Sequence, residues 1–159
     1  MHSGDEKTPA PPACLLCLPR PDDCEHWIKV AQLTVSTLYL DRNQTYRGHC
    51  QLVYDGAHIE GLEQLDDTEY QRLTADLRRA ASAISAAQRP DRMNYASLGN
   101  VVAHVHWHIV PRYRSDPRWG APIYTTDPRD MKVTRLDDAG YGRIIAGIRA
   151  QLENLPWPR

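Results

Sequence analysis

The sequence contains no phenylalanine, no long apolar run and no excess of positive charge. Without an apolar stretch of about 18 residues it offers no transmembrane helix. The formal net charge of −1 argues against general binding to the nucleic-acid backbone. Residues 1–13 lack the apolar segment of a secretory signal, so we expect a cytoplasmic protein. The 159 residues, 42% hydrophobic and 25% charged, suit one globular domain.

Cysteine is also scarce, with four residues: Cys14, Cys17, Cys24 and Cys50. In a chain without an export signal, a disulfide framework is the weaker expectation. Cys14 and Cys17 form a Cys-x-x-Cys pair, which by itself fits either a metal site or a redox site. The pair does not follow a strand that could start a thioredoxin-like unit, which disfavours the redox interpretation. Cys24 and Cys50 receive no role, and Cys50 is expected to be buried in a strand.

The hydrophobic pattern predicts strands, a long helix, further strands and a second helix. Proline, alanine and charge predict a disordered arm over 1–13, followed by a domain core at 14–113. Residues 114–159 are expected to form a C-terminal loop and helix extension of the same domain. The expected elements are strands within 27–40, 49–54, 93–98 and 101–113, and helices over 66–88 and 138–155. This order favours an α+β fold with an antiparallel sheet, in which Asp66 caps the long helix.

The most informative segment holds three histidines in strict alternation, His104, His106 and His108. Side chains alternate across a strand, so we expect the histidines on one face and the apolar residues between them on the other. A catalytic zinc held by all three is one possibility, but the outer Cα atoms of such a strand lie about 13 Å apart. The other is a division of labour, in which one neutral imidazole attacks phosphorus and another donates to phosphate oxygens.

This row resembles the signature of the histidine triad (HIT) superfamily, and the resemblance extends over residues 14–113. Further matching motifs follow in the family's order: Cys14-x-x-Cys17, Leu40-Asp41 with Gly48-His49, Val53-Tyr54 with His58, Gly99-Asn100-Val-Val, and Pro111-Arg112-Tyr113. The sequence is similar to bacterial nucleotide hydrolases that carry a Cys-x-x-Cys zinc site. It departs from them at residues 54–57, which read Tyr-Asp-Gly-Ala where the family commonly has Ile-Pro-Lys, and in its short loop before the histidines.

The resemblance implies an antiparallel sheet with one long and one C-terminal helix. It also implies a homodimer, in which the long helix and the first strand commonly pair across a two-fold axis. The implied reaction is attack on the α-phosphate of a nucleotide, with His106 as the nucleophile and His108 in contact with the phosphate. Asp41 corresponds to the ribose-binding acid, His49 to a recurrent active-site histidine, and Asn100 to a polar residue near the scissile bond.

The resemblance further implies a structural zinc ion. In zinc-containing members the ligands are the Cys-x-x-Cys pair, a downstream histidine and the first triad histidine, which correspond to Cys14, Cys17, His58 and His104. Two thiolates and two imidazoles form a tetrahedral set, and four protein ligands leave no open position for chemistry. The expected role of the ion is therefore to fasten the N-terminal segment to the sheet beside the nucleophile.

Three functions stay open at this level. The leading hypothesis is a hydrolase or transferase that cleaves a dinucleoside polyphosphate or another nucleotide conjugate, phosphoramidates included, through a nucleotidyl-histidine intermediate. The alternative is a non-catalytic, nucleotide-binding interaction module stabilised by zinc, although an intact His106 favours the enzyme. The third is a zinc hydrolase with three histidine ligands. Arg112 and Arg114, after the triad, fit either a solvated loop or a phosphate contact.

Overall fold

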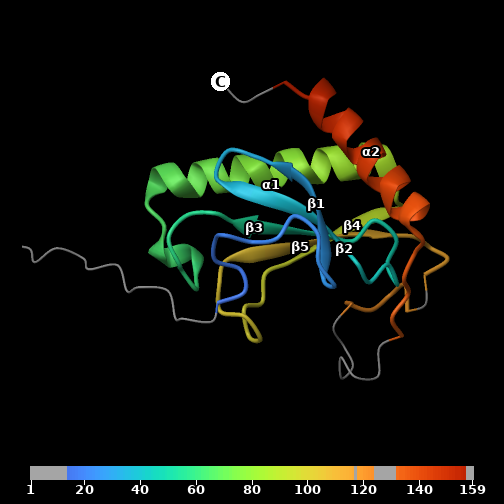
Figure 1. Ribbon diagram of the computed structural model, residues 1–159, viewed down its shortest axis with the longest axis horizontal. Coiled ribbons are helices and arrows are strands. Elements are labelled where there is room, and N and C mark those ends of the chain that lie inside the picture. Colours follow the sequence, from blue (N-terminus) through green and yellow to red (C-terminus); the bar gives the residue numbers. More distant parts are fainter. Residues whose placement is uncertain (1–13, 117, 124–131, 157–159) are drawn as a thin grey trace, which may run out of the picture.

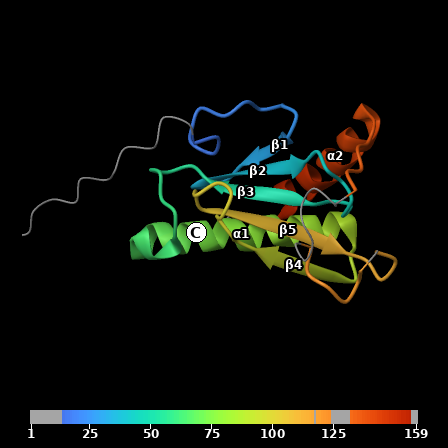
Figure 2. The same ribbon diagram turned by 90° about the horizontal axis from the view of Figure 1, so that it is seen from below.

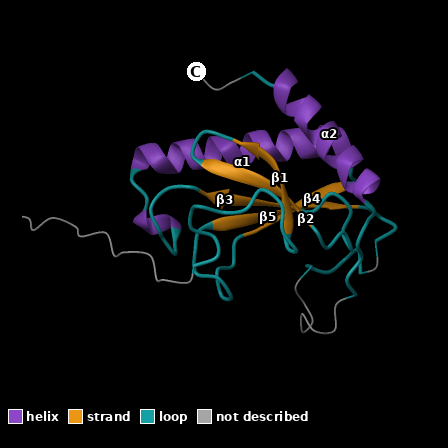
Figure 3. Cartoon of the chain, in the orientation of Figure 1, coloured by secondary structure: helices purple, strands orange, loops and turns teal. Residues whose placement is uncertain are grey.

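The computed structural model describes residues 14–116, 118–123 and 132–156. Within them the chain forms a five-stranded antiparallel sheet with the strand order β1-β2-β3-β5-β4 (Figures 1 and 3). The strands are β1 (Trp27–Gln32), β2 (Ser36–Asp41), β3 (Cys50–Tyr54), β4 (Arg92–Ala96) and β5 (His106–Arg112). The predicted α+β class is confirmed. The arm predicted at 1–13 lies outside the described residues, as do part of the 114–135 loop and the last three residues.

Two long helices, α1 (Asp67–Gln88) and α2 (Asp138–Asn154), lie on one side of the sheet, and a short 3-10 helix, η1 (Leu62–Gln64), precedes α1 (Figure 1). Alternate strand residues pack against the two long helices in the main core, among them Leu38, Leu40, Cys50, Leu52 and Ile109. Burial of this apolar surface stabilises the arrangement of the layers. Neither helix in the described part of the chain is long and apolar enough to cross a membrane.

The helix ends follow the sequence signals. Asp66 caps α1 by accepting a hydrogen bond from the N–H of Glu69, and Asp137 caps α2 in the same way. The long helix ends at Arg89, in a left-handed conformation, directly before Pro90. The carboxylate of Glu69 accepts a hydrogen bond from Tyr54 over 2.6 Å, which ties the first turn of α1 to the end of β3.

The strand expected over 101–113 is shorter than predicted, because β5 begins at His106. Gly99 has a positive φ of 67°, and the N–H of His104 bonds to the carbonyl two residues earlier rather than to a neighbouring strand. The alternation argument therefore applies only to His106 and His108. His104 is placed by a turn outside the sheet, which lets its ring face the N-terminal loop.

Candidate functional site

The side of the sheet that the helices leave open carries a row of polar side chains. In the register of β3 and β5, Gln51 lies opposite His108, and Asp41 ends β2 on the same face. His106 stands two residues before His108 on this face, and His49 lies just before β3. The sheet thus brings four residues predicted to bind or attack a nucleotide to one face, namely Asp41, His49, His106 and His108.

The hydrogen bonds of His106 define its tautomer. Its Nδ1 lies 2.6 Å from the carbonyl oxygen of His104. A carbonyl only accepts, so in the neutral ring Nδ1 carries the proton and Nε2 keeps its lone pair. The hydroxyl of Ser97 donates to the carbonyl oxygen of His106 over 2.8 Å, which ties this residue to the segment after β4. The site therefore holds an imidazole nitrogen that keeps its lone pair, in a defined orientation.

His108 is paired with the buried His49, and Nδ1 of His108 lies 3.1 Å from Nε2 of His49. Burial, aided by the neighbouring His49 and His106, lowers the pKa of His108 to about 3. Burial also lowers the pKa of His49, against the opposing effect of Asp41. Both rings are therefore neutral at pH 7, and one donates a hydrogen bond to the other.

Asp41 lies on the far side of His49, with its Oδ2 3.9 Å from Nδ1 of that ring. The same oxygen accepts a hydrogen bond from the side-chain amide of Gln51 over 2.7 Å. The carboxylate is thus held at the edge of the histidine row, where it can still accept hydrogen bonds from the hydroxyl groups of a ligand.

The four predicted metal ligands lie together beside the start of β5. The Sγ atoms of Cys14 and Cys17 are each 3.7 Å from Nδ1 of His104, and Cys17 Sγ is 3.4 Å from Nδ1 of His58. All four ligand atoms lie within 4.8 Å of one another. Zinc bonds of about 2.3 Å to sulfur and 2.0–2.1 Å to nitrogen give sulfur–nitrogen edges of about 3.6 Å in a tetrahedron. The donor set and its spacing therefore fit zinc.

The ring of His104 is committed to this cluster. Its Nε2 lies 2.8 Å from the carbonyl oxygen of Tyr54, so Nε2 carries the proton and Nδ1 faces the thiols. Burial lowers the pKa of His104, which favours the neutral form that binds metal. Because its free nitrogen points to Cys14 and Cys17 and not to the other triad histidines, a zinc ion held by all three histidines does not match the structure.

Two predicted residues are placed differently from the rest of the site. Asn100 is exposed in the loop between β4 and β5, and its contact with substrate stays a prediction. Arg112 is 2% exposed, and its guanidinium donates to Asp116, to Asn94 and to two backbone carbonyls of the following loop. Its nitrogens thus organise that loop rather than a phosphate site.

Some contacts were not foreseen from the sequence. Gln51 could have been found, because it lies two residues after His49 and so shares its face in an extended segment. Nothing in the sequence marks Ser97 as a partner of His106. The buried Arg20 and the half-buried Asp55 form an ion pair next to the thiol loop, and both likewise stand in segments that look like ordinary polar turns.

Both the sequence and the fold of this chain resemble those of known proteins. The profile of the HIT domain family matches residues 25–115. An adenosine 5′-monophosphoramidase of Schizosaccharomyces pombe is 27% identical over 112 residues, which cover 66% of this chain and 80% of that protein.

Two solved structures illustrate the shared fold. A histidine triad protein of Bradyrhizobium japonicum has a TM-score of 0.73 and 23% identity, covering 80% of this chain and 92% of its own. A zinc-bound histidine triad family protein of Mycobacterium smegmatis has a TM-score of 0.55 and 21% identity, covering 79% of this chain and 84% of its own. Since the family profile spans more than half of the sequence and the fold agrees, this chain belongs to the HIT domain family.

Proposed function

We propose that the chain is a nucleotide hydrolase or transferase that acts at an α-phosphate through a covalent intermediate on His106. The observation that carries the proposal is the tautomer of this residue. With Nδ1 donating to the carbonyl of His104 over 2.6 Å, Nε2 is the nitrogen available for attack. A neutral imidazole is a good nucleophile near pH 7 and forms a phosphoramidate that a second step can cleave.

The reaction would take two displacements. In the first, Nε2 of His106 attacks phosphorus, a P–N bond forms, and the leaving group departs with the electrons of its bond to phosphorus and takes up a proton. In the second, water or another acceptor attacks, a P–O bond forms, the P–N bond breaks and the acceptor releases a proton. Two in-line displacements retain the configuration at phosphorus overall.

The neighbouring polar residues would bind the nucleotide. If Nε2 of His49 donates to Nδ1 of His108, then Nε2 of His108 carries a proton and can donate to a phosphate oxygen as charge develops. Asp41 would accept hydrogen bonds from the ribose hydroxyls, and Asn100 would approach the scissile bond from its loop.

The substrate class follows from the same chemistry. The intermediate requires only a nucleoside phosphate with a leaving group on its α-phosphorus, so dinucleoside polyphosphates and nucleoside phosphoramidates both qualify. The name of the Schizosaccharomyces pombe relative, an adenosine 5′-monophosphoramidase, supports including phosphoramidates.

Mass spectrometry tests the intermediate. Adenosine 5′-phosphoramidate and diadenosine tetraphosphate are mixed with the protein and quenched within one turnover without acid, because acid cleaves P–N bonds. We expect a nucleotide adduct on His106 and, with a substrate chiral at the α-phosphorus, net retention of configuration. Net inversion at phosphorus would show a direct displacement by the acceptor and overturn the covalent mechanism.

We also propose a structural zinc ion, one per chain, held by Cys14, Cys17, His58 and His104. The support is the chemistry of the four donors and their sulfur–nitrogen distances of 3.4 and 3.7 Å, together with the zinc-bound relative from Mycobacterium smegmatis. Bound there, zinc would crosslink the N-terminal loop to the segment before β5. Elemental analysis of protein purified without added metal should find one zinc per chain. Less than about 0.2 per chain, with the thiols reduced, contradicts the site.

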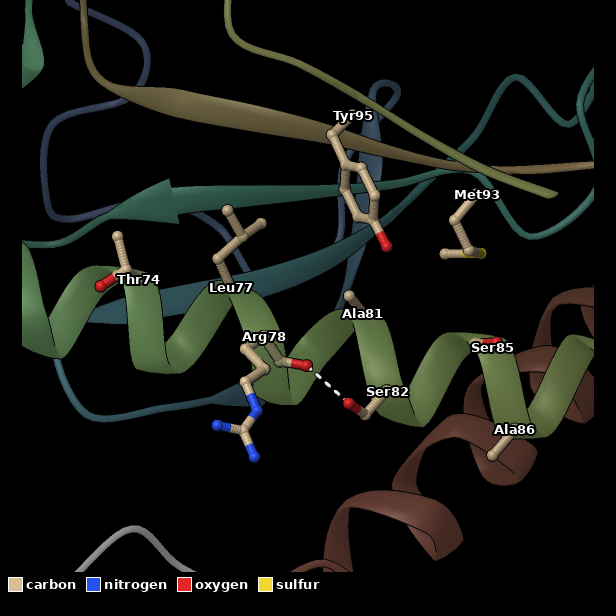
Figure 4. A pocket seen from close by; sticks show the side chains of 9 residues that line it. All are labelled: Thr74, Leu77, Arg78, Ala81, Ser82, Ser85, Ala86, Met93 and Tyr95. Carbon is tan, nitrogen blue, oxygen red and sulfur yellow. Dashed lines mark hydrogen bonds between the residues drawn. The ribbon is translucent and has the colours of Figure 1, made fainter.

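We further propose that the chain forms a homodimer. A groove of about 630 Å³ runs between α1 and the edge strand β4, lined in part by Leu77, Ala81, Met93 and Tyr95 (Figure 4). A second copy would cover this edge, so the contact would involve α1 and β4 rather than the long helix and the first strand that the resemblance implies. The other edge is partly occupied within the chain, because the carbonyls of Lys29 and Val30 on β1 accept hydrogen bonds from Arg149. Light scattering at micromolar concentration should give twice the chain mass, and a monomer mass contradicts the dimer.

A further inference from the structure

Arg20 lies in the loop between the Cys-x-x-Cys pair and β1, and its side chain is 0% exposed. Each guanidinium nitrogen has a different acceptor. Nη1 donates to the backbone carbonyl of Leu16, Nη2 to the carboxylate of Asp55, and Nε to the hydroxyl of Tyr39 over 3.0 Å. Because a buried charge is costly unless it is paired and hydrogen-bonded, these three contacts hold the group in one orientation.

The three acceptors of Arg20 come from separate segments. Leu16 stands between the two thiols, so its carbonyl belongs to the metal-binding loop itself. Tyr39 is part of β2, and Asp55 follows the last residue of β3. The carboxylate of Asp55 is anchored in turn by the hydroxyl of Thr37 on β2, over 2.8 Å. Arg20 therefore fastens the thiol loop to two strands of the sheet.

The other half of the metal cluster is held at the same end of β3. The carbonyl of Tyr54, the residue before Asp55, accepts from Nε2 of His104 over 2.8 Å and so turns Nδ1 toward the thiols. The adjacent residues Tyr54 and Asp55 thus orient His104 and, through Arg20, the thiol loop. Figure 2 shows the consequence, with the N-terminal loop (blue) and the loop before β5 (yellow) at one end of the sheet.

We propose that Arg20 is the positioning residue of the metal site and holds Cys14 and Cys17 in binding geometry before an ion arrives. A loop that is already ordered loses less conformational entropy when it binds metal, so preorganisation raises the affinity. Lysine would keep the charge, but a single ammonium cannot serve three acceptors in the directions that the planar guanidinium reaches. Arg20 thus contributes to metal affinity without touching the metal.

Zinc affinity is the direct readout. The purified protein is titrated with a chromogenic zinc chelator, and the absorption spectrum of Co²⁺ reports whether tetrahedral thiolate coordination persists. Arg20→Lys should weaken zinc binding by about tenfold or more, as is typical when a residue that orients a ligand is changed. Asp55→Asn should weaken zinc binding in the same direction, because it removes the charged anchor of the guanidinium.

Arg149→Lys is the matched control. The guanidinium of Arg149 also donates to backbone carbonyls, those of Val30 and Lys29, but it joins α2 to β1 and not to the thiol loop. This variant should lower thermal stability and leave the zinc affinity within about twofold of wild type, because it leaves every residue around the ion in place.

The outcomes separate the hypotheses. Equal zinc affinity in wild type and folded Arg20→Lys overturns the proposal, and so does an equal loss of affinity in Arg20→Lys and Arg149→Lys. If Arg20→Lys does not fold, unchanged affinity in Asp55→Asn overturns it. A wild-type protein that binds no zinc overturns the metal site and this role with it. None of these results bears on the chemistry proposed for His106.

Discussion

Strands β3 and β5 present different chemistry on their two sides. On the helix side, Leu52 and Ile109 are fully buried in the main core and contribute apolar contacts alone. On the open side, the rings of His106, His108 and His49 are also largely shielded from solvent, but each makes a hydrogen bond with a named partner. The same backbone ladder therefore supports a packed core on one side and a set of oriented imidazoles on the other.

The difference teaches what each side contributes. Apolar burial is non-directional, so the helix side stabilises the fold through the apolar area that it buries and the core volume that its side chains fill. Hydrogen bonds are directional, so the open side determines which nitrogen of each histidine carries a proton. Substitutions on the open side should therefore change activity more than stability, and those on the helix side should do the reverse.

The largest expected effect is on the open side, for His106→Asn. Asparagine keeps much of the shape but cannot form a phosphoramidate, so turnover should fall at least about a thousandfold, or about 4 kcal/mol in the barrier. The Kd of a nucleotide, measured by calorimetry, should change by less than about tenfold. The exposed His26→Asn is the control and should retain full activity. Substantial turnover by His106→Asn would remove this residue as the nucleophile.

The matching test of the helix side is Ile109→Ala. Ile109 is fully buried, so removing its methyl groups should lower the free energy of unfolding by about 3 kcal/mol through lost transfer energy and a cavity. Denaturant unfolding measures this, and nucleotide affinity at a temperature where the variant is folded should match wild type. A variant that kept its stability but lost nucleotide binding would reverse the assignment of the two sides.

A smaller effect is expected when the partner of His108 is changed. His49→Leu removes the hydrogen bond between the two rings, so kcat should fall by about a hundredfold, as when one preorganised donor is lost. In His49→Gln the side-chain amide can still donate to Nδ1 of His108, and kcat should stay within about tenfold of wild type. Equal kcat values for the two variants would show that the hydrogen bond does not orient His108.

The smallest effect concerns the pH dependence of stability. The pKa values of His49 and His108 are lowered in the folded state, while the unfolded chain takes up protons near pH 6.5. Stability is therefore greatest above about pH 6.5 and declines as the pH falls toward 3. Between pH 6.5 and 5.5 the loss from His108 should be about 1 kcal/mol, and His49 should add to it in the same direction.

Chemical denaturation at the two pH values measures this loss. His49→Leu has one such histidine fewer, so its unfolding free energy should depend less on pH than that of wild type. Both proteins are compared at full zinc occupancy, so that release of metal does not contribute. An identical pH dependence in the two proteins would remove His49 as a source of acid destabilisation.

Much of this architecture could be predicted from local patterns. The period of the apolar residues located both helices, Asp66 marked the start of α1, and Pro90 followed its end. The alternation of His106 and His108 placed them on one face, and the separation of the two thiols from His58 and His104 matched a family pattern. These signals are readable because helix and strand periodicities depend on neighbours in the sequence.

The rest could not be read in this way. The alternating row of histidines predicted that His104 lies in a strand with His106 and His108. In the structure a turn after Gly99 places His104 outside β5. From the sequence Arg112 fitted either a solvated loop or a phosphate contact, yet its buried guanidinium is bonded to Asp116 and to the backbone of the following loop. Both outcomes depend on residues that reach these side chains only in the folded chain.

What the sequence by itself determined is the class of the fold, the nature of the reactive groups and which of them share a face. What only the tertiary structure decided is how each group is oriented. The strand order β1-β2-β3-β5-β4 brings Asp41 and His49 close to His108. It also brings the end of β3 into contact with both Arg20 and His104. The protonated nitrogen of an imidazole depends on the acceptor it meets, and that acceptor comes from a distant segment.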